Sequence, residues 1–194
     1  MMNEKLFTLE DIIEMTLRDG ESWAVAHARR LLQLINEIGQ DISYDAQALT
    51  LATYLHDWGA FPCYAQKGVE HALRSRQIAE SEILPHMDLT PSKKEVILEA
   101  IELHDYRDTR PTISKEALLL READMLEFLG MIGMARDFAR GPKDVEACYR
   151  RILKRRAGIQ GHFTIPCAQE IAKVRFERME QGLHWLQEES YGIL

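Results

Sequence analysis

The sequence predicts an all-α protein, a single-domain helical bundle that takes in all 194 residues. Apolar residues recur every three or four positions along most of the chain, which is the period of a helix with one buried face. No stretch of useful length alternates apolar and polar residues as a strand does. Capping residues and glycine or proline stops separate one periodic segment from the next, so the segments are expected to be distinct helices joined by short loops.

The N-terminal half of the chain is predicted to contain four helices, each with a start or a stop signal. Thr8 can cap the first helix because Asp11, three residues on, completes a capping box, and Gly20 follows its end. The second helix stops at Gly39, and Pro85 ends the fourth. These helices are expected over residues 8–19, 22–38, 45–57 and 68–84.

The C-terminal half continues the pattern. Thr90 is the cap and Pro91 the first residue of the fifth helix. Gly130 and Gly133 predict a break or close packing after the sixth helix, and Pro142 is expected to open the seventh. These helices and the last one are expected over residues 91–104, 114–130, 142–158 and 165–189.

Composition and charge exclude several classes of function. The formal net charge is -7, and a field of that sign repels phosphate backbones, so we expect no nucleic-acid polymer as a partner. The three cysteines, Cys63, Cys148 and Cys167, form no CxxC pair and no disulfide framework, which is typical of reduced thiols in a cytoplasm. We see no signal peptide and no apolar run near the roughly 20 residues of a membrane span. We therefore expect a cytoplasmic protein without a membrane partner, either a monomer or a homodimer.

One stretch, LATYLHDWGAF at 51–61, places His56 and Asp57 side by side after an apolar run. An imidazole and a carboxylate resist burial unless they are paired or bound to a cation. Taken alone, such a doublet is most simply a solvated helix end. The other histidines argue for a different interpretation.

Three of these histidines, His27, His71 and His104, share the apolar, helical surroundings of the doublet. Together with His56 they lie on four consecutive expected helices. Asp124 lies within another apolar helix. Helical bundles build metal sites from side chains on facing helices. Histidine together with carboxylate suits Fe, Mn, Ni, Co or Zn, and a carboxylate-rich set tolerates Mg. The pattern therefore predicts a metal site.

The order His27, then His56-Asp57, then Asp124 resembles the signature of the HD-domain superfamily of metal-dependent phosphohydrolases. WAVAHARRLLQLINEIG and LATYLHDWGAF resemble its first-ligand and doublet helices. KGVEHALRSRQIAESEIL and READMLEFLGMIGMARDF resemble segments of small, stand-alone bacterial HD proteins. The similarity covers about 22–139, which would be the HD core, and leaves about 142–190 as a C-terminal helical extension of the same domain.

The resemblance implies a ligand set for one or two divalent ions, namely Mn, Fe, Ni, Co or Mg. His71 and His104 fall where binuclear members place two extra histidines. Asp57 is expected to bridge the two ions and to act in catalysis, since two ions about 3.5–4 Å apart can clamp the attacking and leaving oxygens. His104-Asp105 is a second His-Asp pair that could be confused with the signature doublet. We prefer His56-Asp57 because it follows an apolar helix and lies 29 residues after His27, and we expect Asp105 to begin the loop after His104. The implied metal ligands are His27, His56, Asp57, His71, His104 and Asp124.

Cations near these ligands are candidates to hold a substrate phosphate. Lys67 ranks first because it lies in the loop between two ligand-bearing helices. Arg107, Arg30 and Arg74 each stand three residues after a ligand histidine, and Arg110 and Arg136 are further candidates. We expect Lys67 and Arg107 to act in catalysis, and Arg30, Arg74 and Arg110 to bind substrate. For each of them the alternative is a solvated or structural cation.

The leading hypothesis is a metal-dependent phosphohydrolase that hydrolyses a small phosphorylated substrate, with a nucleotide as the favoured kind, through a metal-activated water. One alternative is an HD-type di-iron oxygenase, because a few enzymes of the superfamily activate dioxygen with the same six ligands. Another is a non-catalytic nucleotide-binding module. No base-recognition motif is visible, and the superfamily hosts many reactions, so the sequence does not identify the substrate.

Overall fold

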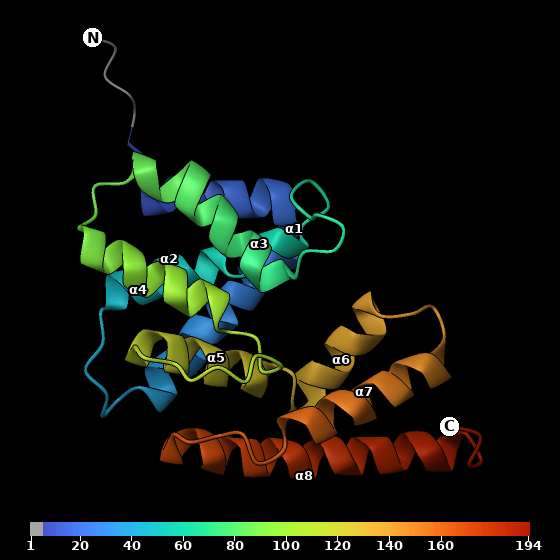
Figure 1. Ribbon diagram of the computed structural model, residues 1–194. Helices are drawn as coiled ribbons and strands as arrows, with labels where there is room; N and C mark the ends of the chain where they lie inside the picture. Colours follow the sequence, from blue (N-terminus) through green and yellow to red (C-terminus); the bar gives the residue numbers. More distant parts are fainter. Residues whose placement is uncertain (1–5) are drawn as a thin grey trace. The chain divides into compact units, whose positions relative to one another are not determined.

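The computed structural model describes residues 6–194, and within this range the protein is built from α-helices and short 3-10 or π segments, without a strand (Figure 1). This confirms the predicted all-α class. The chain divides into two compact units, Met1–Arg121 and Glu122–Leu194, and the division falls inside helix α5 (Lys115–Glu127). The extent of the HD core and of its C-terminal extension stays a prediction.

The first unit contains four complete helices, three short segments and the start of α5. The elements are α1 (Leu9–Ile38), α2 (Ala46–Leu55), η1 (Trp58–Ala60), α3 (His71–Ile78), η2 (Ala79–Ile83), η3 (Leu84–His86) and α4 (Pro91–Glu102). Helix α2 packs on both α1 and α4, and α3 packs on α4 and on η1. The buried core includes Leu31, Leu55, Trp58 and Ile101.

Helix α1 is two helices joined at a kink, as its sequence predicts. Thr8 and Asp11 form the expected capping box, and Glu21 leaves the helical region with φ 60° and ψ -179°. Gly20 lies beside this kink. A larger residue would not fit at this position, because an added Cβ would come within 2.2 Å of the Phe61 ring. The chain therefore turns where a small residue allows the ring to pack against the backbone.

The second unit contains the end of α5 together with α6 (Gly130–Arg140), α7 (Val145–Ile159) and α8 (Pro166–Glu189). Helix α6 packs on both α7 and α8. Gly130 has φ +70°, which accounts for the predicted break after α5. The expected start of α7 at Pro142 is wrong: the Asp144 side chain accepts a hydrogen bond from the backbone N–H of Ala147, so the helix begins at the residue after that cap.

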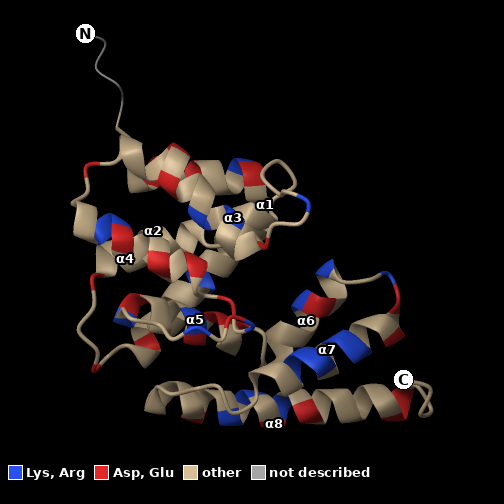
Figure 2. Cartoon of the chain, in the orientation of Figure 1, with Lys and Arg blue, Asp and Glu red and all other residues tan. Residues whose placement is uncertain are grey.

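Basic residues gather along α7 (Figure 2), and two of them have a buried partner in the same unit. Arg151 and Arg155 each place a guanidinium nitrogen 2.6 Å from Asp137 Oδ1. This face of α7 is therefore partly neutralised by packing within the unit.

None of the described helices combines the length and the apolar character needed to span a membrane.

Candidate metal centre

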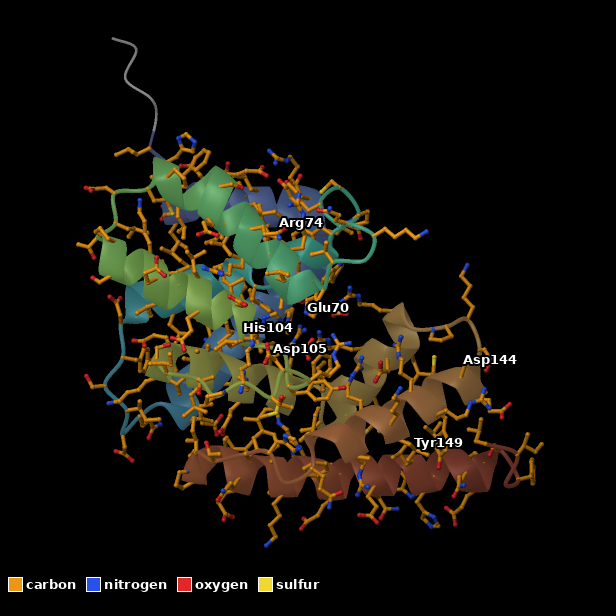
Figure 3. The ribbon with its side chains drawn as sticks, in the orientation of Figure 1. Glu70, Arg74, His104, Asp105, Asp144 and Tyr149 are labelled. Atoms are coloured by element: carbon orange, nitrogen blue, oxygen red, sulfur yellow. The ribbon has the colours of Figure 1, made fainter. Side chains whose placement is uncertain are left out.

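Four histidines from four helical segments converge within the first unit. His27 lies on α1, His56 follows the end of α2, His71 opens α3, and His104 follows the end of α4 (Figure 3 labels His104). Three of them are buried, while the side chain of His71 is 24% exposed. Three of the imidazoles are therefore shielded from solvent, and His71 is the one that is partly accessible.

The imidazoles form two pairs through their Nε2 atoms. The Nε2 atoms of His27 and His56 lie 3.2 Å apart, and those of His71 and His104 are also 3.2 Å apart. Nitrogen atoms that converge in this way can share a cation, for which neutral imidazole is a common ligand.

Two of the rings have their outer nitrogen held by backbone. The Nδ1 atom of His56 lies 2.7 Å from the carbonyl oxygen of Thr53, and that of His104 lies 2.7 Å from the carbonyl oxygen of Ile101. A carbonyl only accepts hydrogen bonds, so we assign the ring proton to Nδ1, which leaves a lone pair on Nε2. This is the tautomer and the outer contact typical of metal-binding histidine. The donor set therefore fits a divalent ion.

Asp57 lies between the two pairs and turns one carboxylate oxygen to each. Its Oδ2 is 3.7 Å from Nε2 of His27 and 3.6 Å from Nε2 of His56. Its Oδ1 is 3.6 Å from Nε2 of His71 and 3.9 Å from Nε2 of His104. His56, Asp57 and His104 each offer a ligand atom to one group whose atoms all lie within 4.8 Å of one another. The geometry supports the expected bridging role.

The protonation of Asp57 follows from the same neighbours. Burial acts to raise its pKa, but the charge that the surrounding imidazoles carry when they are protonated, with His56 first and His27 next, outweighs burial and holds the pKa of Asp57 well below its usual range. Asp57 is therefore a carboxylate near neutral pH, the form that can ligate a cation through both oxygens.

A close backbone approach brings His71 to Asp57. An added Cβ on Gly59 would lie 2.2 Å from the carbonyl oxygen of His71 and 2.7 Å from the backbone nitrogen of Ser75. The backbone N–H of Gly59 donates to the Ser75 hydroxyl at 2.8 Å. The 3-10 segment that follows the doublet therefore lies directly against the start of α3.

The sixth expected ligand, Asp124, is buried on α5 and belongs to the second unit. Its part in the ligand set stays a prediction.

The expected phosphate-binding cations have different surroundings. Lys67 is exposed in the loop before α3, and Arg30 is half-buried on α1. Nε of Arg74 donates to the carbonyl oxygen of Tyr64 at 2.9 Å, so part of this guanidinium is committed to the loop. Arg107 and Arg110 are exposed and each pairs with an aspartate two residues earlier, and Arg110 also reaches Glu102.

Asp105 is not in the predicted ligand set, yet it lies beside that set. It follows α4, as expected for the start of a loop, but its Oδ2 lies 3.7 Å from Nε2 of His71. Burial acts to raise its pKa, and hydrogen bonds from Arg107 outweigh burial, so the pKa of Asp105 lies below its usual value. The only signal in the sequence was that Asp105 stands next to His104.

A pocket of about 610 Å³ opens where Asp105 and the two paired arginines meet the start of α3. Such a pocket is large enough for a small ligand. Its lining includes Glu70, Leu73, Glu102, Asp105, Arg107 and Arg110 (Figure 3 labels two of them, Glu70 and Asp105).

Comparisons with known proteins place the fold among solved structures. Three similar solved structures are a predicted HD superfamily hydrolase of an uncultured Thermotogales bacterium, YpgQ of Bacillus subtilis in complex with ADP, and an HD-superfamily hydrolase of Bacillus thuringiensis. Their TM-scores are 0.64, 0.69 and 0.64, at 23%, 19% and 19% identity. The matches cover 93%, 94% and 94% of this chain and 90%, 97% and 96% of the other chains.

At these identities the likeness shows the fold alone. No curated protein matches the chain. The family model described as the HD domain matches residues 24–129, a span that includes both histidine pairs, Asp57 and Asp124. The resemblance seen in the sequence is thereby confirmed, and the chain belongs to the HD domain family.

Proposed function

We propose that this protein is a metal-dependent phosphohydrolase that acts on a small phosphorylated molecule, with a nucleotide as the expected kind. The observation that carries the proposal is Asp57, which turns one carboxylate oxygen to each of two imidazole pairs. Membership of the HD domain family supports the same reaction class.

The chain's own residues would hold one or two divalent ions, chosen from Mn, Fe, Ni, Co and Mg. His27 and His56 would bind on one side of Asp57, and His71 and His104 on the other. Asp124 stays in the expected set because the family match includes it. When bound, such ions screen the charge of a phosphate ester and lower the pKa of water.

Protein groups around the ligands would orient the substrate. Backbone carbonyls fix the rings of His56 and His104, so their Nε2 lone pairs do not have to reorganise. Lys67 is the cation we expect at the substrate phosphate, and Arg110 lines the neighbouring pocket. The complex of YpgQ with ADP, a protein 19% identical to this one, supports the choice of a nucleotide.

The test begins with a metal analysis of the purified full chain. Phosphate and pyrophosphate release would then be measured from nucleotides and sugar phosphates with Mn, Mg, Co or Ni added. We expect metal-dependent release in the wild type and loss of release in the double variant His56→Ala/Asp57→Ala. His86→Ala, which changes a histidine outside the cluster, is the matched control and should behave as wild type.

Two outcomes would replace the proposal. Equal release by the wild type and by a double variant with unchanged helical circular dichroism would favour a non-catalytic nucleotide-binding module. Two bound irons, with oxygen consumption and no phosphate release, would favour the di-iron oxygenase.

A further inference from the structure

We propose that Asp105 is a further ligand of the cation held by His71 and His104, and that Arg107 is the positioning residue that fixes its carboxylate. The inference rests on the proposed two-ion site. It assigns a metal role to a residue that the expected ligand set omits, and it gives Arg107 a different task from binding phosphate.

The distances around His71 carry the first step. Its Nε2 atom has three neighbouring donor atoms: Nε2 of His104 at 3.2 Å, Oδ1 of Asp57 at 3.6 Å and Oδ2 of Asp105 at 3.7 Å. Atoms that each lie about 2.1 Å from one ion are themselves about 3–4 Å apart. Asp105 is thus as well placed relative to His71 as Asp57 is.

The chain also directs Asp105 to this place. It directly follows His104, whose ring is anchored on the last turn of α4 by the carbonyl oxygen of Ile101. The side chain of Asp105 is only 13% exposed, and its backbone carbonyl accepts the N–H of Asp108 at 2.9 Å in a tight turn. A carboxylate in this turn has little freedom to move into solvent.

Arg107 binds the carboxylate without using all of its lone pairs. Its backbone N–H donates to Oδ1 of Asp105 at 2.8 Å, and its Nη2 donates to Oδ2 at 2.5 Å. Its Nε–H is shared between Oδ1 at 3.0 Å and Oδ2 at 3.1 Å, so three N–H donors reach the carboxylate. A carboxylate has about four acceptor positions. Oδ2, the oxygen beside His71, can therefore accept Arg107 and ligate a cation at the same time.

Charge favours the same assignment. His71 and His104 supply neutral donors, so Asp57 would bring the only negative charge among the expected ligands on this side of the bridge. Hard and borderline divalent ions bind more strongly where carboxylates neutralise them. Asp105 supplies a second negative charge where a dication is expected.

The chain contains a matched control three residues on. Asp108 and Arg110 repeat the D-x-R turn, with backbone N–H to Oδ1 at 2.9 Å, Nε to Oδ1 at 3.0 Å and Nη2 to Oδ2 at 2.5 Å. Among the described residues, only the first of these two aspartates lies within 4 Å of a histidine nitrogen. A change at Asp108 therefore removes the same kind of arginine pair without touching the expected ligands.

The experiment is a calorimetric titration of the full metal-free chain with Mn²⁺, with stoichiometry checked by elemental analysis. We expect two ions in the wild type and in Asp108→Asn. In Asp105→Asn we expect the first ion to bind as before and the second to bind at least about 10-fold more weakly, the minimum cost of disturbing a metal site's supporting contacts. Arg107→Ala should lower the affinity for the second ion by less than Asp105→Asn does. Asp105→His should restore much of that affinity, because imidazole is also a metal ligand.

The absorption spectrum of the Co²⁺ form gives a second readout, since a lost ligand changes the spectrum and a broken surface ion pair does not. Wild-type affinity for both ions in a folded Asp105→Asn variant would overturn this inference and leave the two-ion function standing. A wild-type chain that binds a single ion with all four histidines intact would remove the two-ion premise, and the inference with it. Circular dichroism of the two Asn variants checks that both are folded.

Discussion

At the scale of single residues, the centre depends on how a few side chains are held. The imidazoles of His56 and His104 are each anchored by a backbone carbonyl three residues earlier, at the end of a helix. Asp57 then lies within 4 Å of four imidazole nitrogens. Each of its two carboxylate oxygens faces a different imidazole pair. Asp57 should therefore contribute to the binding of two ions, whereas each histidine should contribute to the binding of one.

Replacing Asp57 by Ala should abolish the binding of both ions or strongly lower the affinity for both. Activity should fall by roughly 100-fold or more, because the loss of a ligand should exceed the losses of about 10- to 100-fold typical of residues that only support the ligands. His71→Ala should lose only the ion on its own side. Elemental analysis of the two purified variants distinguishes these results. A folded Asp57→Ala variant with full metal content would refute the bridging role.

Gly59 sets the spacing between the doublet and α3. Gly59→Ala should lower the free energy of unfolding by about 1–3 kcal/mol, because the added Cβ would meet backbone atoms rather than a flexible side chain. It should also reduce metal affinity, since the backbone of His71 has to move. The neighbouring change Ala60→Ser, at an exposed position, should stay within about 0.5 kcal/mol in the same urea titration.

At the scale of elements, the kink in α1 stores local strain next to the segment that carries the doublet. Glu21 has φ 60° and ψ -179°, a backbone region that suits glycine almost alone. The kink lets Gly20 lie against Phe61, which closes the 3-10 segment after Asp57. The break therefore links the first helix to the metal centre through packing.

Because of this strain, Glu21→Gly should raise the free energy of unfolding by about 1 kcal/mol. Ser22→Gly, one residue later and in helical conformation, should lower it by a few tenths to about 1 kcal/mol. Thermal and urea unfolding of both variants give the comparison. A loss of stability in Glu21→Gly equal to that in Ser22→Gly would show that the kink carries no strain.

The loop that carries Lys67 is tied to α1 through Tyr64. Its hydroxyl donates to Oδ2 of Asp19 at 3.0 Å, and its ring stacks on Trp58 with centroids 5.5 Å apart. Burial, followed by the hydrogen bond to Asp19, raises the pKa of Tyr64 to about 12. The neutral phenol is therefore the form that stabilises this loop.

This raised pKa predicts a loss of stability at high pH. Tyrosine in the unfolded chain titrates near pH 10, so between about pH 10 and 12 the folded protein keeps a proton that the unfolded chain has lost. The contribution of Tyr64 is complete below pH 10 and disappears as the pH rises through 12. The stability difference between wild type and Tyr64→Phe should shrink by about 1 kcal/mol from pH 9 to 12, a figure reduced for the partial exposure of the ring. A difference that does not change with pH would contradict the raised pKa.

At the scale of the whole molecule, the chain comprises two units, and each contains buried polar side chains. In the first unit these include three of the four histidines of the metal centre. In the second unit the carboxylate of Glu122 is fully buried and accepts hydrogen bonds from the backbone N–H and the hydroxyl of Thr164, at 2.7 and 2.6 Å, and from the backbone N–H of Ile165 at 3.1 Å. These bonds fix the residues that lead into α8. A buried carboxylate with several donors is costly to remove because the donors then lose their partner.

Glu122→Ala should therefore destabilise the second unit by roughly 2–4 kcal/mol. Glu170→Ala, at an exposed position on α8, should have an effect below about 0.5 kcal/mol. Hydrogen exchange of the α8 amides, compared between the two variants, locates the effect. Unchanged protection in Glu122→Ala would show that this anchor does not hold the unit together.

Much of the fold could be predicted from local chemistry. Thr8, Thr90 and Pro91 mark helix starts in the structure as they do in the sequence, because a cap depends on residues within one turn. The expected start at Pro142 was wrong for an equally local reason, since Asp144 is the better cap. The ligand order could be proposed from spacing and resemblance, but the surroundings of Arg74, Arg107 and Asp105 could not.

Periodicity, capping and composition within short windows are enough to predict the helical class, most helix boundaries and the order of the candidate ligands. The pairing of His27 with His56 and of His71 with His104, with Asp57 between the pairs, becomes visible only in the folded chain. The partners in these pairs are 29 and 33 residues apart, so their meeting depends on how whole helices pack. The same packing brought Asp105 beside His71, and it turned a residue expected only to begin a loop into a candidate ligand.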